Sequence, residues 1–243
     1  MRSDQPIISA TLLSEYCYAT APRRARILEQ MSSDEFEPFK NWYGELPGAY
    51  RRHLATGTTD PEPLDALERL LVKRHAATTE EDNKALKQLD AIEHIRAIDH
   101  SRLFSDGQVL AFDHLPRTFS LAGTVIRTNP TNLIIAHRLG FREPFVGVVK
   151  PYLKATRPLP PEEAKTFCAI LHWFVERQLA HIGTADFRLV WIADIFQEQL
   201  CSAPRSFVRR RELIEASATE IADRWPTFLS RRLTTPDPAV SGA

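Results

Sequence analysis

The chain has 243 residues, of which 43% are hydrophobic and 26% charged, a composition typical of a folded globular protein rather than a disordered one. Its 31 lysines and arginines balance its 31 aspartates and glutamates, so net charge does not attract nucleic acid, and any such contact requires a local basic patch. The sequence has three isolated cysteines, no glycine-rich phosphate loop and no long apolar run. These features argue against a disulfide framework, a P-loop and a membrane span, and we expect a cytoplasmic protein without a membrane partner.

The first part of the chain, residues 1–104, is predicted to be a helical subdomain. Apolar residues recur at helical spacing over residues 9–31, and Pro22 is expected to begin a second helix there. Ser32 and Glu35 match a capping box that would open the next segment. Further amphipathic helices are predicted over residues 64–75 and 79–98.

The pattern changes near residue 105, where β-branched and aromatic residues interrupted by Gly, Pro and Asn predict several strands. A long helix from Pro161, a strand around residues 186–197 and a last helix closed by Pro226 follow. The strand, helix, strand order predicts a crossover and a parallel pair. We therefore expect an α/β (α+β) fold, with a mixed-sheet core flanked by helices over residues 105–232 and a disordered tail over 233–243.

One lysine stands out in the strand "FVGVVKPYLK". Alternation places Lys150 on the same face as Val146, Val148 and Tyr152, which is unusual for an ammonium group. Either Lys150 lies at the end of the strand with its amine in water, or it points into a polar site and stabilises a phosphate or activates a water. Both alternatives stay open from the sequence.

The stretch around Lys150 resembles the PD-(D/E)XK nucleases. In that group a "PD" hairpin is followed by an acid-x-Lys strand and then by a long helix; here "PTNLII", "VGVVK" and the helix from Pro161 stand in this order, within residues 108–198. The resemblance implies a nucleic-acid substrate and Mg²⁺ held between two carboxylates, where the metal would polarise the scissile phosphate and activate water. Lys150 would then be the charge-stabilising catalytic residue.

The chain departs from that pattern at both acidic positions. Thr131 occupies the position of the "PD" aspartate and is followed by Asn132, and Val148 occupies the acid of acid-x-Lys. Either the metal ligands have moved or the scaffold has lost cleavage. Candidates for displaced metal ligands are Asp113, Glu143 and Asp194.

Asp194 is the strongest of these candidates because "LVWIADIF" embeds it among apolar residues. A buried carboxylate needs a partner or a metal, since burying it ionised and alone costs several kcal/mol. We expect it either to be catalytic and ligate Mg²⁺, or to cap the next turn or pair with an arginine.

Two arginine clusters could contact a phosphate backbone. Arg23 and Arg24 lie in one helical turn near the N-terminus, and Arg209, Arg210 and Arg211 begin a C-terminal region with a local excess of positive charge. The alternative is a solvated helix face with Glu–Arg pairs. The acidic segment 80–99 is expected to repel nucleic acid.

The sequence thus predicts a Mg²⁺-dependent phosphodiester hydrolase or an inactive nuclease-like nucleic-acid-binding protein. The alternative is a non-enzymatic protein-interaction or regulatory protein from a defence or mobile-element system. Convergence of carboxylates on Lys150 in space would favour the enzyme.

Overall fold

A computed structural model describes residues 5–32, 43–74, 79–112 and 114–234 of the chain. Its helices are α1 Ala10–Tyr18, α2 Ala21–Ser32, α3 Leu46–Ala55, α4 Glu62–Arg74, α5 Thr79–Ala97, α6 Ser101–Ser105, α7 Pro161–Gln178 and α8 Val208–Thr234. Its strands are β1 Ile7–Ser9, β2 Gln108–Ala111, β3 Thr118–Leu121, β4 Thr124–Arg127, β5 Asn132–Ala136, β6 Phe145–Tyr152, β7 Thr184–Ala185, β8 Trp191–Asp194 and β9 Gln199–Ser202. The expected mixture of helices and mixed sheet is confirmed.

The larger sheet has the strand order β2-β5-β6-β8-β9, with β7 paired to β6 off this path. Strands β2, β5 and β6 form an antiparallel meander, whereas β6 and β8 are parallel, with Lys150 opposite Ile192 and Tyr152 opposite Asp194. Helix α7 makes the crossover between β6 and β8, because parallel neighbours cannot be joined by a tight turn. The predicted parallel pair is confirmed.

A second sheet of three strands has the order β1-β4-β3. Strand β1 runs parallel to β4, with Ser9 opposite Arg127, and β3 pairs with β4 through a tight antiparallel turn. The chain leaves β4 at Arg127 and enters β5 at Asn132, so residues 128–131 connect the two sheets.

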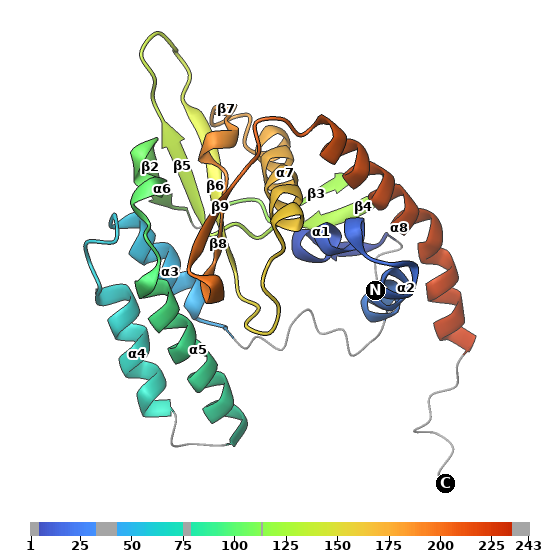
Figure 1. The fold of residues 1–243 in the computed structure, drawn as a ribbon, viewed down its shortest axis with the longest axis horizontal. Coiled ribbons are helices and arrows are strands. Elements are labelled where there is room, and N and C mark those ends of the chain that lie inside the picture. The colour runs from blue at the N-terminus through green and yellow to red at the C-terminus, as the bar shows by residue number, and fades with distance from the viewer. Residues whose placement is uncertain (1–4, 33–42, 75–78, 113, 235–243) are drawn as a thin grey trace.

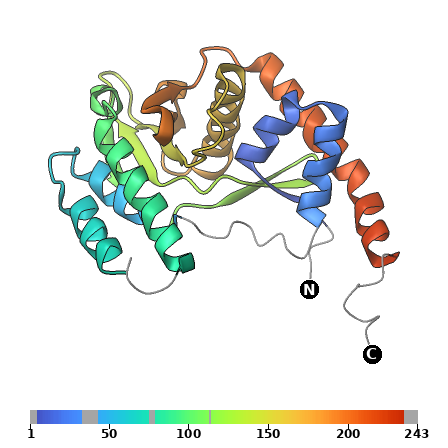
Figure 2. The ribbon, with the colours of Figure 1, turned by 60° about the horizontal axis from the view of Figure 1, so that its bottom comes forward.

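The helices cover the sheets in separate groups. Figure 1 shows α3, α4 and α5 at one end of the molecule and α1, α2 and α8 at the other, with the larger sheet and α7 between them. The turned view in Figure 2 shows the same separation. The loop between β5 and β6 projects from the body beyond the ends of these strands (Figure 1).

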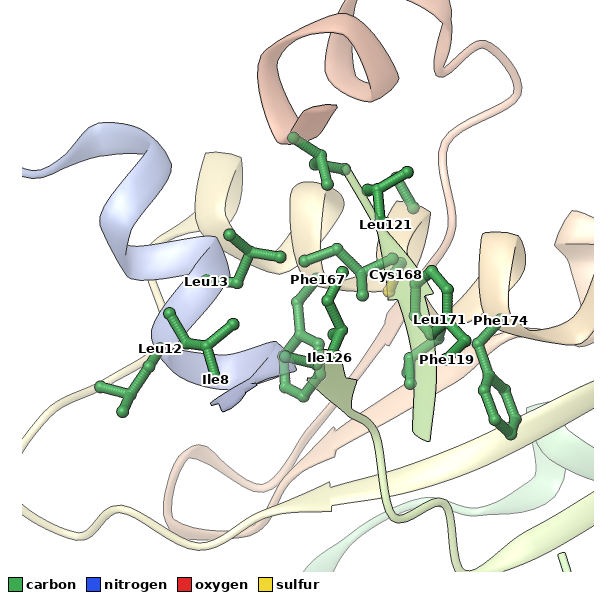
Figure 3. Packing of buried hydrophobic residues seen from close by; sticks show 14 of the residues in the cluster. Ile8, Leu12, Leu13, Phe119, Leu121, Ile126, Phe167, Cys168, Leu171 and Phe174 are labelled. Carbon is green, nitrogen blue, oxygen red and sulfur yellow. The ribbon is translucent and has the colours of Figure 1, made fainter. Parts of the chain in front are cut away.

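The first hydrophobic core lies between α7, the smaller sheet and helices α1, α2 and α8. Ile8, Leu13, Ile126, Phe167 and Phe174 are among its members, all buried. Figure 3 shows the apolar side chains of β1, β3, β4, α1 and α7 packed against one another. Val146, Val148 and Tyr152 of β6 join this core, as the alternation of β6 predicts.

The second core lies on the other face of the larger sheet, under α3 to α6. Leu46, Leu64 and Ile92 of the helices pack with Ile134 of β5 and Val149 of β6. Each core draws residues from both sides of residue 104, so the described helices of the predicted subdomain 1–104 divide between the two cores.

The local predictions from the sequence have different outcomes. Residues 9–31 form two helices as predicted, but β1 precedes them and was not anticipated. The expected end of the last helix at Pro226 is wrong, because α8 continues through this proline to Thr234. The Ser32–Glu35 capping box and the tail after residue 234 lie outside the described residues.

Among the helices described, none combines the length and apolarity needed to cross a membrane.

Candidate functional site

Lys150 lies near the carboxyl end of β6 and is partly buried. Alternation along β6 places its side chain on the same face as Val148 and Tyr152, which belong to the first core. The ammonium Nζ donates a hydrogen bond to the backbone oxygen of Asn129, at 2.8 Å. Lys150 therefore ties β6 to the connection between the two sheets.

That connection has a distinctive backbone. Asn129 adopts φ +44°, in the left-handed region that asparagine tolerates better than most residues. The preceding Thr128 bonds the backbone oxygen of Arg117 through both its amide and its hydroxyl, at 2.8 and 3.2 Å. These contacts fix the Asn129 carbonyl where Lys150 reaches it.

A cavity of about 610 Å³ opens beside Lys150. One wall, which we call the sheet wall, is formed by the ends of β1, β4 and β6 and the residues that follow them, and it carries Arg127, Lys150 and Lys154. The rest of the lining, which we call the helical wall, comes from Tyr43, from Pro47 of α3 and from Lys87 and Asp90 of α5. We refer to the whole as the Lys150 pocket.

The positive charges of the sheet wall are incompletely compensated. Among the described residues, no carboxylate forms an ion pair with Lys150 or Arg127, and Asp90 is the single described acid that lines the pocket. Burial lowers the pKa of Lys150 from 10.5 to about 8. An anion bound in the pocket would stabilise the ammonium form that burial disfavours.

Lys154 is held differently, by the buried carboxylate of Glu15. Glu15 contacts Arg23 at 2.7 Å, Arg157 at 3.4 Å and Lys154 at 3.6 Å. Burial alone would raise the pKa of Glu15, but the hydrogen bond from Arg23 and the charges of Lys154 and Arg157 outweigh it and lower the pKa. Burial lowers the pKa of Lys154, and Glu15 opposes that shift.

Arg157 also donates hydrogen bonds to both carboxylate oxygens of Glu163 of α7, at 2.7 and 2.9 Å. Its backbone oxygen accepts the hydroxyl of Tyr152 at 2.9 Å. This network positions the segment after β6 that lines the pocket. Its two acids, Glu15 and Glu163, already form ion pairs with cations of the network.

Asp194 ends β8 and is buried, with 2% of its surface exposed. Its Oδ2 accepts the backbone amide of Leu159 at 3.1 Å, so a backbone group provides the partner that a buried carboxylate requires. Burial raises its pKa, and the Leu159 amide opposes the shift. Asp194 lies beside Tyr152 in register but does not line the Lys150 pocket.

The other two proposed metal ligands are not brought to Lys150. Glu143 is exposed in the β5–β6 loop before β6 begins at Phe145, and the strand from Phe145 to Lys150 rises about 3.3 Å per residue, so its start lies roughly 16 Å from Lys150. Asp113 lies outside the described residues. Within the described part of the chain, no group of three or more His, Cys, Asp and Glu side chains is arranged to hold a metal ion.

The two positions aligned with the nuclease motif do come together. The amide of Thr131 donates to the backbone oxygen of Val149 at 2.9 Å, so the start of β5 lies beside the Lys150 end of β6. Asn132 is fully buried and donates its side-chain amide to the backbone oxygens of Arg51 and Leu110. These side chains and the buried Val148 support the fold and supply no carboxylate.

Most of the proposed nucleic-acid-binding arginines form ion pairs between elements. Arg23 pairs with Glu15, Arg24 with Glu220, Arg210 with Glu162 and Arg211 with Glu176, while Arg209 is exposed. Arg211 also lies over the rings of Trp173 and Phe207. The four paired arginines thus fasten α2 and α8 to their neighbours.

Several pocket residues were not singled out from the sequence: Tyr43, Lys87, Asp90 and Arg127. Lys87 and Asp90 belong to the acidic segment 80–99, which we expected to repel nucleic acid, and both line the pocket. The available sequence signal was the Asn- and Pro-containing bend at residues 128–131, which marks where two strands end together.

No protein-family model and no curated protein sequence matches this chain.

Proposed function

We propose that this protein binds nucleic acid through the Lys150 pocket, with a phosphate held by the cationic groups of the sheet wall. The observation that carries the proposal is that Lys150 and Arg127 line one cavity without a described carboxylate partner. Cations that converge in a partly enclosed, low-dielectric cavity favour an anionic ligand, and arginine suits phosphate through its planar fork. The pocket volume lies within the usual range for ligand sites, about 300–1,000 Å³.

The order of elements supports a nucleic acid as the source of that phosphate. The hairpin of β5 and β6, the lysine near the end of β6 and the long helix α7 stand in the order on which the sequence resemblance to PD-(D/E)XK nucleases rests. Proteins of that group act on nucleic acid phosphodiesters. The resemblance supports the ligand class and does not establish activity.

Mg²⁺-dependent phosphodiester hydrolysis stays a prediction. Asp194 has one carboxylate oxygen, Oδ1, that is buried and has no hydrogen-bond partner among the described residues, as a metal ligand could have. Mg²⁺ is usually held by one or two carboxylates together with substrate phosphates. Asp194 does not line the pocket that would receive the phosphate, so the described residues do not fit a Mg²⁺ shared with that phosphate.

The alternative, a non-enzymatic protein-interaction or regulatory protein, has one supporting feature. Leu139 and Phe141 are strongly exposed on the projecting β5–β6 loop (Figure 1). This loop lies at the opposite end of β6 from Lys150, so a protein contact there would be compatible with an occupied pocket.

The test compares nucleic-acid affinity of the wild type with Lys150→Gln by fluorescence anisotropy, using a labelled single-stranded and a labelled duplex oligonucleotide at low salt. We expect Lys150→Gln to weaken binding of the preferred form by about tenfold, since one charge-assisted phosphate contact is lost. The matched control is Lys73→Gln, an exposed lysine of α4 that does not line the pocket. Equal losses in both variants, or no binding by the wild type, would contradict the proposal.

The same samples, incubated with Mg²⁺ or Mn²⁺, test hydrolysis. Cleavage that is lost in both Lys150→Gln and Asp194→Asn would show that the chain also cuts its ligand.

A further inference from the structure

The two walls of the Lys150 pocket differ in chemistry. Arg127 and Lys150 stand on the sheet wall, whereas the helical wall carries the acid Asp90 and the ring of Tyr43 beside one cation, Lys87. Tyr43 and Asp90 belong to one cluster, because the ring of Tyr43 lies 6.1 Å from that of Phe196 and the ring of Phe196 lies 5.3 Å from that of His94. The carboxylate of Asp90 also lies 3.7 Å from Nε2 of His94 on the next turn of α5.

A groove that only follows a phosphate backbone would gain nothing from an acid on its wall, because the acid repels phosphate. An acceptor beside an aromatic ring suits a different group, one that is flat and carries hydrogen-bond donors. Nucleobases with an exocyclic amino group have both properties, since they stack on aromatic side chains and donate to carboxylates.

We infer that the pocket holds one unpaired nucleotide, with its phosphate on Arg127 and Lys150 and its base on Tyr43, where Asp90 accepts a hydrogen bond from the amino group of the base. This inference rests on the proposed function, nucleic-acid binding, and specifies the ligand class as an unpaired nucleotide. The base must be unpaired because stacking between neighbouring base pairs in a duplex buries the face that Tyr43 would contact.

Two sources share this chemistry, a nucleotide within single-stranded nucleic acid and a free nucleoside monophosphate. The cavity of about 610 Å³ is large enough for a ligand of nucleotide size in either case. Cytosine carries the amino donor that Asp90 would accept, and uracil carries a carbonyl at the same position, so the pair is a direct probe of Asp90.

The experiment measures, by competition against a labelled oligo-dC, the affinities of cytidine monophosphate, uridine monophosphate, ribose 5-phosphate, unlabelled oligo-dC and a hairpin-capped duplex. We expect cytidine monophosphate to bind about tenfold or more tightly than ribose 5-phosphate, from base stacking. We also expect it to bind more tightly than uridine monophosphate, and the duplex to compete poorly. If oligo-dC binds far more tightly than cytidine monophosphate, the ligand is a nucleotide within a strand. If the two bind with equal affinity, the ligand is the free nucleotide.

Variants assign these preferences to residues. Tyr43→Leu should abolish the advantage of cytidine monophosphate over ribose 5-phosphate, while Tyr43→Phe, which keeps the ring, should retain it. Asp90→Asn should reduce the preference for cytosine over uracil. Equal binding of ribose 5-phosphate and cytidine monophosphate by the wild type, or displacement by duplex as effective as by oligo-dC, would overturn the inference and leave phosphate binding intact. Failure of every phosphate-bearing probe to bind would instead contradict the proposed function.

Discussion

At the scale of single residues, Lys150 carries its positive charge at a position where burial disfavours the ammonium form. Its pKa of about 8 lies below the ordinary value of 10.5, and its neighbours on β6 belong to a hydrophobic core. Such a residue weakens the folded state at neutral pH, as ligand-binding groups commonly do.

We predict that Lys150→Met raises the free energy of unfolding at pH 7 by about 1 kcal/mol while phosphate binding weakens by about tenfold, as in Lys150→Gln. Methionine fills the same space without the charge. Urea denaturation of both proteins measures the change, and Lys150→Arg, which keeps a charge at all accessible pH values, is the control that should show no gain. A less stable Lys150→Met variant would contradict this account.

The buried charge of Glu15 stabilises the folded state, in contrast to that of Lys150, because three cations surround its carboxylate. We predict that Glu15→Gln lowers the free energy of unfolding at pH 7 by about 1–3 kcal/mol, less than for a fully buried pair because the cations are partly exposed. The exposed pair of Glu62 and Arg69 supplies the control, since Glu62→Gln should cost no more than about 0.5 kcal/mol.

The pH dependence of this effect follows from the lowered pKa of Glu15. The folded chain holds the carboxylate ionised at pH values where the unfolded chain, with an ordinary pKa of 4.5, is already protonated. The stabilisation is therefore complete above pH 4.5 and is lost as pH falls through the folded pKa. Urea titrations should show the gap between wild type and Glu15→Gln narrowing below pH 4.5; a gap independent of pH would refute the ion-pair explanation.

At the scale of elements, close packing of backbones constrains β6 most tightly at Gly147. A Cβ atom there would lie 2.1 Å from the backbone oxygen of Leu189, so the segment before β8 would have to move. Gly48, within α3, has only an ordinary contact at 3.8 Å from Arg52.

We predict opposite effects of alanine at these two glycines. Gly147→Ala should cost at least about 3 kcal/mol of stability or prevent folding, whereas Gly48→Ala should add about 0.5–1 kcal/mol through helix propensity. Thermal denaturation followed by circular dichroism compares the two. A Gly147→Ala protein as stable as the wild type would show that β6 and the Leu189 backbone are not in contact.

Long periodic segments were the predictable part of the fold. Helices α1, α2, α4, α5 and α7 follow the spacing of apolar residues, and α7 begins at the expected Pro161. Strand β1 has only three residues and exists because β4 pairs with it, which no local pattern indicates. Helix α8 passes through Pro226 because Trp225 and Phe228 are buried in the first core and their packing outweighs the missing amide hydrogen bond.

The candidate site was predictable only in part. Alternation along β6 identified Lys150 as unusual for its face of the strand. Arg127, Tyr43 and Asp90 come from three other elements, and their approach to Lys150 depends on how the sheets and α5 pack together. The arginine clusters were ambiguous because an exposed charge run and a network of interhelical ion pairs have the same composition.

At the scale of the whole molecule, the two hydrophobic cores lie on opposite faces of shared strands. Val148 of β6 belongs to one core and Val149 to the other, so neither core can separate while the strand stays folded. We therefore expect the described parts of residues 1–104 and 105–232 to unfold together.

Ile92→Ala, in the second core, tests this expectation. We predict a loss of about 2–4 kcal/mol and one transition in which circular dichroism and tryptophan fluorescence still coincide, since Trp191 and Trp225 report on different cores. Leu86→Ala, on the exposed face of the same helix, should change stability little. Two separate transitions, with only one shifted by Ile92→Ala, would show independent units.

The central claim is that the ammonium of Lys150 contacts the phosphate of a bound nucleic acid, and the dependence of affinity on pH tests it most directly. Oligo-dC affinity should be measured by anisotropy from pH 6.5 to 9.5 at constant ionic strength, for the wild type and for Lys150→Arg. Because only the protonated lysine contacts phosphate and its pKa in the free protein is about 8, wild-type affinity should be flat below pH 8 and fall above it toward the affinity of Lys150→Gln, a total loss of about tenfold. Lys150→Arg should bind with little pH dependence over this range. A flat wild-type profile, or an unchanged fall in Lys150→Arg, would contradict the assignment of the phosphate contact to Lys150.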